Sequence, residues 1–172
     1  MVPSRLPLEA TYSCFQSHIR PAWEDRHNAE GGEIRVFFNK SAVSAVDAAW
    51  SSLLLAAVGE TLLDGAEALV CGLTVSRKKH KSKIAVWTDR SDGAARAALE
   101  EAMRKAIGPD VLTRLGLVLE WTSHRQLLDK EKLKDSAILP TSSRGGSSTY
   151  VPLKQRNHKV NRPPSVGDSP KN

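Results

Sequence analysis

The sequence predicts an α+β fold, in which helices pack on one face of an antiparallel sheet. Two observations carry this prediction. Segments with strand-like alternation and segments with helical periodicity follow one another along the chain. The strand-like runs 69–76 and 82–89 are joined by a link that is too short for a parallel crossover, so they are expected to pair antiparallel. Helices would then cover one side of the sheet.

The first part of the chain, residues 1–32, shows little periodicity and is predicted to be irregular, ending in a turn at Gly31-Gly32. The next segment, 33–39, alternates enough to be a strand. One of its faces should point into the core, because it carries Ile34, Val36 and Phe38.

Two helices follow from periodicity and capping residues. The first covers 42–58, where apolar side chains recur at Val46, Trp50, Leu54 and Val58. Ser44 with Asp47 resembles a capping box, and Gly59 is a suitable C-cap. The second helix covers 91–107, with Ser91 or Asp92 as its cap and Gly108-Pro109 as its stop. Its buried side is predicted to carry Leu99, Met103 and Ile107.

The end of the sequence divides into a last strand and a basic tail. The strand is predicted at 116–121, and the domain is predicted to span 1–125. From Gln126 onward, nine Lys or Arg residues stand against four Asp or Glu, which accounts for most of the net charge of +6. A short charged helix can form at the start of this tail, and Ser, Pro, Gly and Lys predict disorder for the rest of 126–172. A tail of this charge is attracted to RNA or another polyanion.

Several functional classes find no support in the sequence. No nucleotide-binding or nucleophile motif is present, so neither an enzyme nor a cofactor is predicted. The five histidines are scattered and do not pair with the two cysteines, so no metal site is expected. The first residues lack the apolar region of a signal peptide, and no apolar stretch is long enough for a bilayer. A cytoplasmic protein without a membrane partner is therefore expected.

The residues that carry chemistry are Trp23, Glu24, Trp87 and the basic run 77–83. An indole offers a face on which a flat cationic ring can stack. A carboxylate accepts hydrogen bonds, as the adjacent N–H donors of guanine require. Basic side chains bind phosphates, and the run holds Arg77, Lys78, Lys79, Lys81 and Lys83. This combination suits a phosphorylated, positively charged purine.

Simpler interpretations of the same residues stay open. Trp23 can be a half-buried packing residue where a loop meets a strand. The basic run can be a solvated turn or a nuclear localisation patch, which leaves a nuclear pool of the protein open. Trp50 lies on the apolar stripe of the first helix and is mostly a core residue.

In order and spacing, four segments resemble the cap-binding translation initiation factor 4E family. They are YSCFQSHIRPAWEDRHNAEGGEI, NK, AWSSLLLAAVGE and VCGLTVSRKKHKSKIAVWTD. The resemblance covers roughly Leu6 to His124. It implies a curved antiparallel sheet with helices on its convex face and the mRNA cap, a 7-methylguanosine nucleotide, on its concave face.

The resemblance implies a role for each site residue. Trp23 matches the second of two tryptophans that sandwich the base, and Glu24 matches the carboxylate that accepts from the guanine edge. Trp87 matches the indole near the N7-methyl group. Arg77 and Lys83 match the phosphate-binding pair, although the link between them is one residue longer here. The first phosphate ligand is therefore either Arg77 or Lys78.

The sequence also departs from the family pattern. No tryptophan precedes Trp23, and the family's first strands and first helix have no counterpart. Weak cap binding is therefore expected, and strands 33–39, 69–76 and 82–89 are expected to lack neighbours. A scaffold or repressor protein with a helical 4E-binding motif would contact Trp50 and Leu55, but Ser51 and Ser52 depart from the family pattern. The alternative functions are a regulatory interaction module with an impaired cap pocket and a sequence-nonspecific RNA binder.

Overall fold

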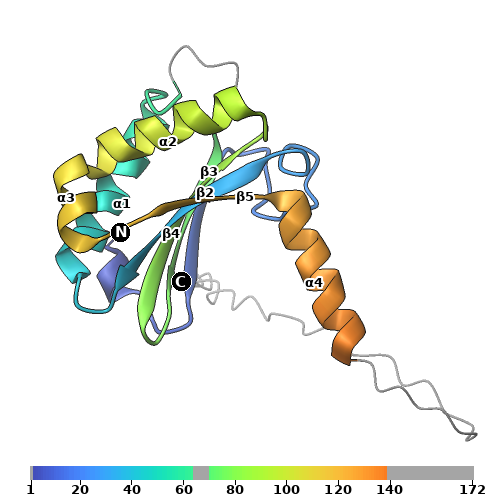
Figure 1. The fold of residues 1–172 in the computed structure, drawn as a ribbon, viewed down its shortest axis with the longest axis horizontal. Coiled ribbons are helices and arrows are strands. Elements are labelled where there is room, and N and C mark those ends of the chain that lie inside the picture. The colour runs from blue at the N-terminus through green and yellow to red at the C-terminus, as the bar shows by residue number, and fades with distance from the viewer. Residues whose placement is uncertain (1, 64–69, 139–172) are drawn as a thin grey trace, which may run out of the picture. The chain divides into compact units, whose positions relative to one another are not determined.

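The computed structural model describes residues 2–63 and 70–138 (Figure 1). None of the helices in these two ranges is long and apolar enough to cross a membrane. The elements in chain order are η1 (Pro3–Arg5), β1 (Thr11–Phe15), β2 (Gly32–Asn39), α1 (Val43–Val58), β3 (Val70–Arg77), β4 (Lys81–Thr88), α2 (Gly93–Ile107), α3 (Pro109–Leu115), β5 (Leu119–Ser123) and α4 (His124–Ile138).

The strands form one antiparallel sheet of five in the order β1-β3-β4-β2-β5. Strands β3 and β4 are neighbours, as their short link predicted. The expectation that 33–39, 69–76 and 82–89 lack neighbours is wrong. Strand β2 lies between β4 and β5, β3 lies between β1 and β4, and β4 lies between β3 and β2. Among the described residues, the edges of the sheet are β1 and β5.

Strand β1 corrects the prediction that residues 1–32 are irregular throughout. It pairs with β3 so that Tyr12 lies opposite Val75 and Cys14 opposite Leu73. The ring of Tyr12 meets Trp50 of α1 edge to face, with centroids 5.9 Å apart. The strand escapes detection because it has only five residues and is defined by pairing with a segment some sixty residues away.

Helices α1, α2 and α3 lie on one face of the sheet (Figure 1) and enclose the main core with it. The alternation of β2 is confirmed, because Ile34, Val36 and Phe38 are all buried against these helices. The buried side of α2 is also confirmed: it carries Leu99, Met103 and Ile107. The stripe on α1 differs from the prediction, since Val58 is exposed and the buried residues are Val46, Ala49, Trp50 and Leu53.

The helix ends agree only partly with the expected caps. Asp92 caps α2 by accepting hydrogen bonds from the backbone N–H groups of Ala94 and Ala95, as predicted. Gly59 is the C-cap of α1. The capping box of Ser44 with Asp47 is wrong, because the Asp47 carboxylate instead accepts from the N–H and hydroxyl of Ser4, at 2.8 and 2.7 Å. Asp47 therefore ties the start of the chain to α1.

The region after α2 contains one element that local sequence does not predict. Gly108 ends α2, but Pro109 begins α3. Proline is favourable at the first position of a helix, where its missing N–H removes no hydrogen bond. The last strand begins later than predicted, because Gly116 is the left-handed C-cap of α3, at φ 59°. Helix α4 takes up residues 124–138, and the remainder of the predicted tail lies outside the described residues.

Candidate functional site

The face of the sheet opposite the helices bears a hollow of about 670 Å³. Four stretches of sequence meet there: β1 with the loop that follows it, β2, the β3–β4 hairpin, and α4. Five of the predicted site residues line it, namely Trp23, Glu24, Lys78, Lys83 and Trp87. Lys81, Phe37 and Glu131 line it as well.

The two tryptophans of the hollow differ in how they are held. Trp87 is buried on β4, where Phe15 meets its ring edge to face at 5.2 Å and the His124 ring lies 4.4 Å from it. Trp23 is half-buried and packs against a small apolar cluster that includes Trp87 and Ile19. Glu24 is exposed beside it. The packing and ligand interpretations of Trp23 are therefore compatible, since one part of the ring packs and another lines the hollow.

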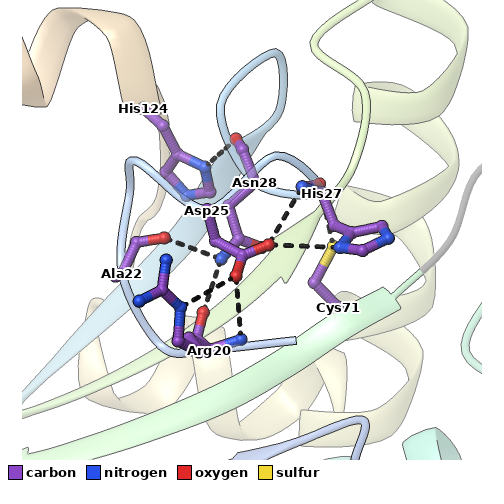
Figure 2. Close-up of polar contacts among 7 residues, drawn as sticks. All are labelled: Arg20, Ala22, Asp25, His27, Asn28, Cys71 and His124. Carbon is purple, nitrogen blue, oxygen red and sulfur yellow. Dashed lines mark hydrogen bonds and ion pairs between the residues drawn. The ribbon is translucent and has the colours of Figure 1, made fainter. Parts of the chain in front are cut away.

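Hydrogen bonds to the side chain of Asp25 stabilise the loop that carries Trp23 and Glu24 (Figure 2). Its carboxylate accepts from the backbone N–H and side-chain Nε of Arg20, both at 3.3 Å, and from the backbone N–H and Nδ1 of His27, both at 3.1 Å. The hydrogen bond from the His27 N–H is the main reason that the pKa of Asp25 lies below its usual range. The ionised carboxylate thus closes the loop on itself.

Asn28 ties the same loop to the rest of the fold (Figure 2). Its side-chain amide donates to the carbonyls of Arg20 and Ala22, both at 2.8 Å. Its own carbonyl accepts from Nδ1 of His124 at 2.6 Å, because a carbonyl oxygen can only accept. Burial lowers the pKa of His124, which keeps the ring neutral. Asn28 and His124 were not predicted as site residues, since neither lies in a pattern that signals such a contact.

The glycine pair after this loop has a steric explanation. A Cβ on Gly31 would collide with the carbonyl oxygen of Thr88 on β4. The carbonyl of Gly31 also accepts from the N–H of His124 at 3.0 Å. A close approach of two backbones therefore requires glycine here, in addition to the predicted turn.

The basic run is divided between two sides of the sheet. Arg77 does not line the hollow; its Nη1 donates to the carbonyl of Leu6 at 2.6 Å. Lys78 does line it, and its Nζ lies 2.8 Å from Oε2 of Glu9. Of the two residues considered as the first phosphate ligand, the structure brings Lys78 and not Arg77 into the hollow with Lys83.

The remaining lysines of the hollow also have partners. Lys83 Nζ lies 3.4 Å from Oε1 of Glu33, whose side chain is 2% exposed. Lys81 Nζ lies 4.1 Å from the centre of the Phe37 ring, which is a cation–π contact. Glu33 and Phe37 were missed because they read as ordinary strand residues. Their placement follows from the register between β2 and β4, which pairs Phe37 with Lys83 and Glu33 with Trp87.

The two residues expected to contact a partner protein differ in exposure. Trp50 is 0% exposed and covered in part by Tyr12, which agrees with a core residue, and its contact with a partner protein stays a prediction. Leu55 is 73% exposed on α1, and Val58 is exposed one turn later.

Among the described residues, no group of three or more His, Cys, Asp or Glu is placed to hold a metal ion. Burial raises the pKa of the Cys71 thiol to about 12.

Comparison with known proteins places this arrangement in a family. Translation initiation factor 4E1 of Drosophila melanogaster is 31% identical over 132 residues, which is 75% of this chain and 48% of that protein. Factor 4E-2 of Schizosaccharomyces pombe is 34% identical over 142 residues, which is 83% of this chain and 51% of that protein. The chain thus spans about half the length of these curated relatives.

A solved structure and a family profile agree with these relatives. The crystal structure of Ascaris suum eIF4E-3 with the m2,2,7G cap matches with a TM-score of 0.58 and 28% identity, covering 62% of this chain and 60% of that one. The sequence profile described as "Eukaryotic initiation factor 4E" matches residues 1–138. Since that match includes the whole sheet and every helix that the structure describes, the chain belongs to the eukaryotic initiation factor 4E family.

Proposed function

We propose that this chain binds the 7-methylguanosine cap of mRNA in translation initiation. The observation that carries the proposal is that Trp23, Glu24, Trp87 and three lysines line one hollow, although they come from distant parts of the sequence. The Ascaris relative, which was solved with a methylated cap, supports it. The proposed function is binding and involves no chemical step.

Each part of the ligand has a counterpart in the hollow. The methylated base is cationic and flat, and it would stack on the exposed part of Trp23, a contact worth about 1–3 kcal/mol. Glu24 would accept hydrogen bonds from the guanine N–H groups. Its side chain is exposed, and its carboxylate accepts no hydrogen bond from another described residue. Lys78, Lys81 and Lys83 would contact the phosphates. Trp87 would support the side of the base that bears the methyl group.

The test is a titration of the chain with 7-methylguanosine triphosphate and with guanosine triphosphate, followed by tryptophan fluorescence. We expect tighter binding of the methylated nucleotide, because only that base carries a ring charge. Trp23→Ala should abolish the preference, whereas Trp121→Phe, outside the hollow, should preserve it. Equal affinities, with a steep dependence on salt, would instead identify a nonspecific polyanion binder.

A second candidate function is docking of a protein partner on α1. The exposure of Leu55 and Val58, two apolar side chains on one helix, favours it. A helical 4E-binding peptide should then bind the chain, and Leu55→Ser should weaken that binding without changing the affinity for nucleotide. A peptide that binds equally well to both variants would remove this candidate.

A further inference from the structure

The hollow is less positive than its lysines alone suggest. Lys78 is paired with Glu9 and Lys83 with Glu33, while Lys81 lies over an aromatic ring. Glu24 and Glu131 add two further carboxylates to the lining. A phosphate chain that enters the hollow therefore meets lysines whose charge is already largely matched by carboxylates.

The carboxylates paired with Lys78 and Lys83 lie in very different surroundings. The side chain of Glu9 is 61% exposed, so water and salt screen its charge. The side chain of Glu33 is 2% exposed, and screening inside the protein is much weaker. Of these two carboxylates, Glu33 is therefore the one whose charge acts more strongly on a phosphate bound to its lysine.

The hydrogen bonds of Glu33 are incomplete. Its Oε1 contacts Lys83 at 3.4 Å and lies 3.9 Å from Nη1 of Arg35. That arginine is shared with Glu120, whose Oε2 is 3.2 Å from its Nε. The other oxygen of Glu33, Oε2, is buried and has no hydrogen-bond partner among the described residues. Lys83 is thus the main group that compensates the buried carboxylate.

We propose that Glu33 sets the phosphate preference of the hollow, an inference that rests on the proposed function. A phosphate on Lys83 approaches a buried carboxylate of the same sign. Each additional phosphate gains attraction from the lysines and loses part of it to repulsion from Glu33. The affinity of the hollow therefore rises little from a nucleoside monophosphate to a triphosphate, and Glu33 is a specificity-determining residue.

The experiment compares Glu33→Gln with the unaltered chain in binding 7-methylguanosine monophosphate and triphosphate at one salt concentration. Glutamine keeps the shape and removes the charge. We expect the affinity for the triphosphate to rise about tenfold and that for the monophosphate to rise about threefold or less. Glu100→Gln removes a carboxylate from α2, where it pairs with Arg104, and should change neither affinity.

Equal gains for both nucleotides, or a loss of affinity, would overturn the proposal. If Glu33→Gln does not fold, the unaltered chain still decides the matter. A gain below about tenfold from monophosphate to triphosphate supports the role of Glu33, and a larger gain overturns it.

Inorganic triphosphate, used as a third probe, separates this inference from the proposed function. It has no base, so a gain in its affinity on Glu33→Gln supports the inference even if methylated and unmethylated nucleotides bind equally. In that case the cap-binding function fails while the role of Glu33 stands. If the chain prefers the methylated nucleotide but Glu33→Gln changes the affinity for no phosphate probe, the cap-binding function stands and the role of Glu33 fails.

Discussion

The Nδ1 atom of His124 lies 2.6 Å from the main-chain oxygen of Asn28, and this hydrogen bond joins the loop beneath Trp23 to the start of α4. Asn28 also holds the loop through two side-chain hydrogen bonds. We expect Asn28→Ala to destabilise the fold by about 1–3 kcal/mol, because it leaves the carbonyls of Arg20 and Ala22 without these partners. Thermal melts measure this loss.

The exposed Asn39, at the end of β2, provides the matched control. Asn39→Ala should change the stability by about 0.5 kcal/mol or less. An equal loss for the two variants would show that Asn28 does not brace the loop.

The stability of the fold should depend on pH through His124. Burial lowers its folded-state pKa below the ordinary value of 6.5. As the pH falls below about 6.5, the unfolded chain takes up a proton that the folded ring resists, so the free energy of unfolding decreases. Above that value the imidazole is neutral in both states, so it does not make the free energy of unfolding depend on pH.

Melts between pH 8 and pH 5 measure this dependence, and His124→Gln should flatten it. His80→Gln, on the exposed turn between β3 and β4, is the control for losing a histidine. A further loss is expected below about pH 4, where the depressed pKa of Asp25 makes protonation unfavourable in the folded state. A stability that stays constant from pH 7 to pH 5 would argue against the buried neutral ring.

Gly31 tests the close approach between the loop and β4. Its missing Cβ leaves room for the Thr88 carbonyl, and Gly31→Ala forces two backbones apart. We expect a destabilisation of about 2 kcal/mol or more, together with weaker nucleotide binding. Gly93→Ala, at the start of α2 where nothing lies within 4 Å of the added Cβ, should be neutral or slightly stabilising. Similar melting temperatures for both variants would contradict this.

The ion pair between Lys83 and Glu33 should also contribute to the free energy of unfolding in the absence of a ligand. Lys83→Ala leaves the buried carboxylate without its main partner, which should cost about 1–3 kcal/mol. Lys81→Ala removes only a contact with an aromatic ring and should cost less than about 1 kcal/mol. Adding Glu33→Gln to Lys83→Ala should restore part of the loss, and additive effects of the two changes would show that they do not interact.

The long elements of this fold follow from local sequence, whereas the short elements β1 and α3 do not, and the short strand β5 was predicted with shifted bounds. Strands β2, β3 and β4 and helices α1 and α2 have enough residues for their periodicity to identify them. Strand β1 and helix α3 have five and seven residues, too few for a pattern to stand out. Strand β1 forms because it pairs with β3, and the local sequence of β1 contains no signal of that pairing.

The same distinction applies to the site. Trp23, Glu24 and Trp87 stand out because they are unusual in their segments, and they do line the hollow. Glu33 does not stand out, because alternation alone makes it an ordinary strand residue. Its importance arises from the register of two strands, which places a buried carboxylate beside Lys83. In the same way, local sequence does not show that the side chain of Lys78 lines the hollow while that of Arg77 contacts Leu6 instead.

The most direct test of cap binding uses the four tryptophans of the chain as internal reporters. A ¹H–¹⁵N spectrum resolves their indole N–H signals, which can be assigned by replacing each residue in turn with Phe. On addition of 7-methylguanosine triphosphate, the signals of Trp23 and Trp87 should shift, because both residues line the hollow. The signals of Trp50, a buried residue of α1, and of Trp121, outside the hollow, should stay in place. Unmoved signals of Trp23 and Trp87 at saturating nucleotide, or larger shifts at Trp50 and Trp121, would contradict the account.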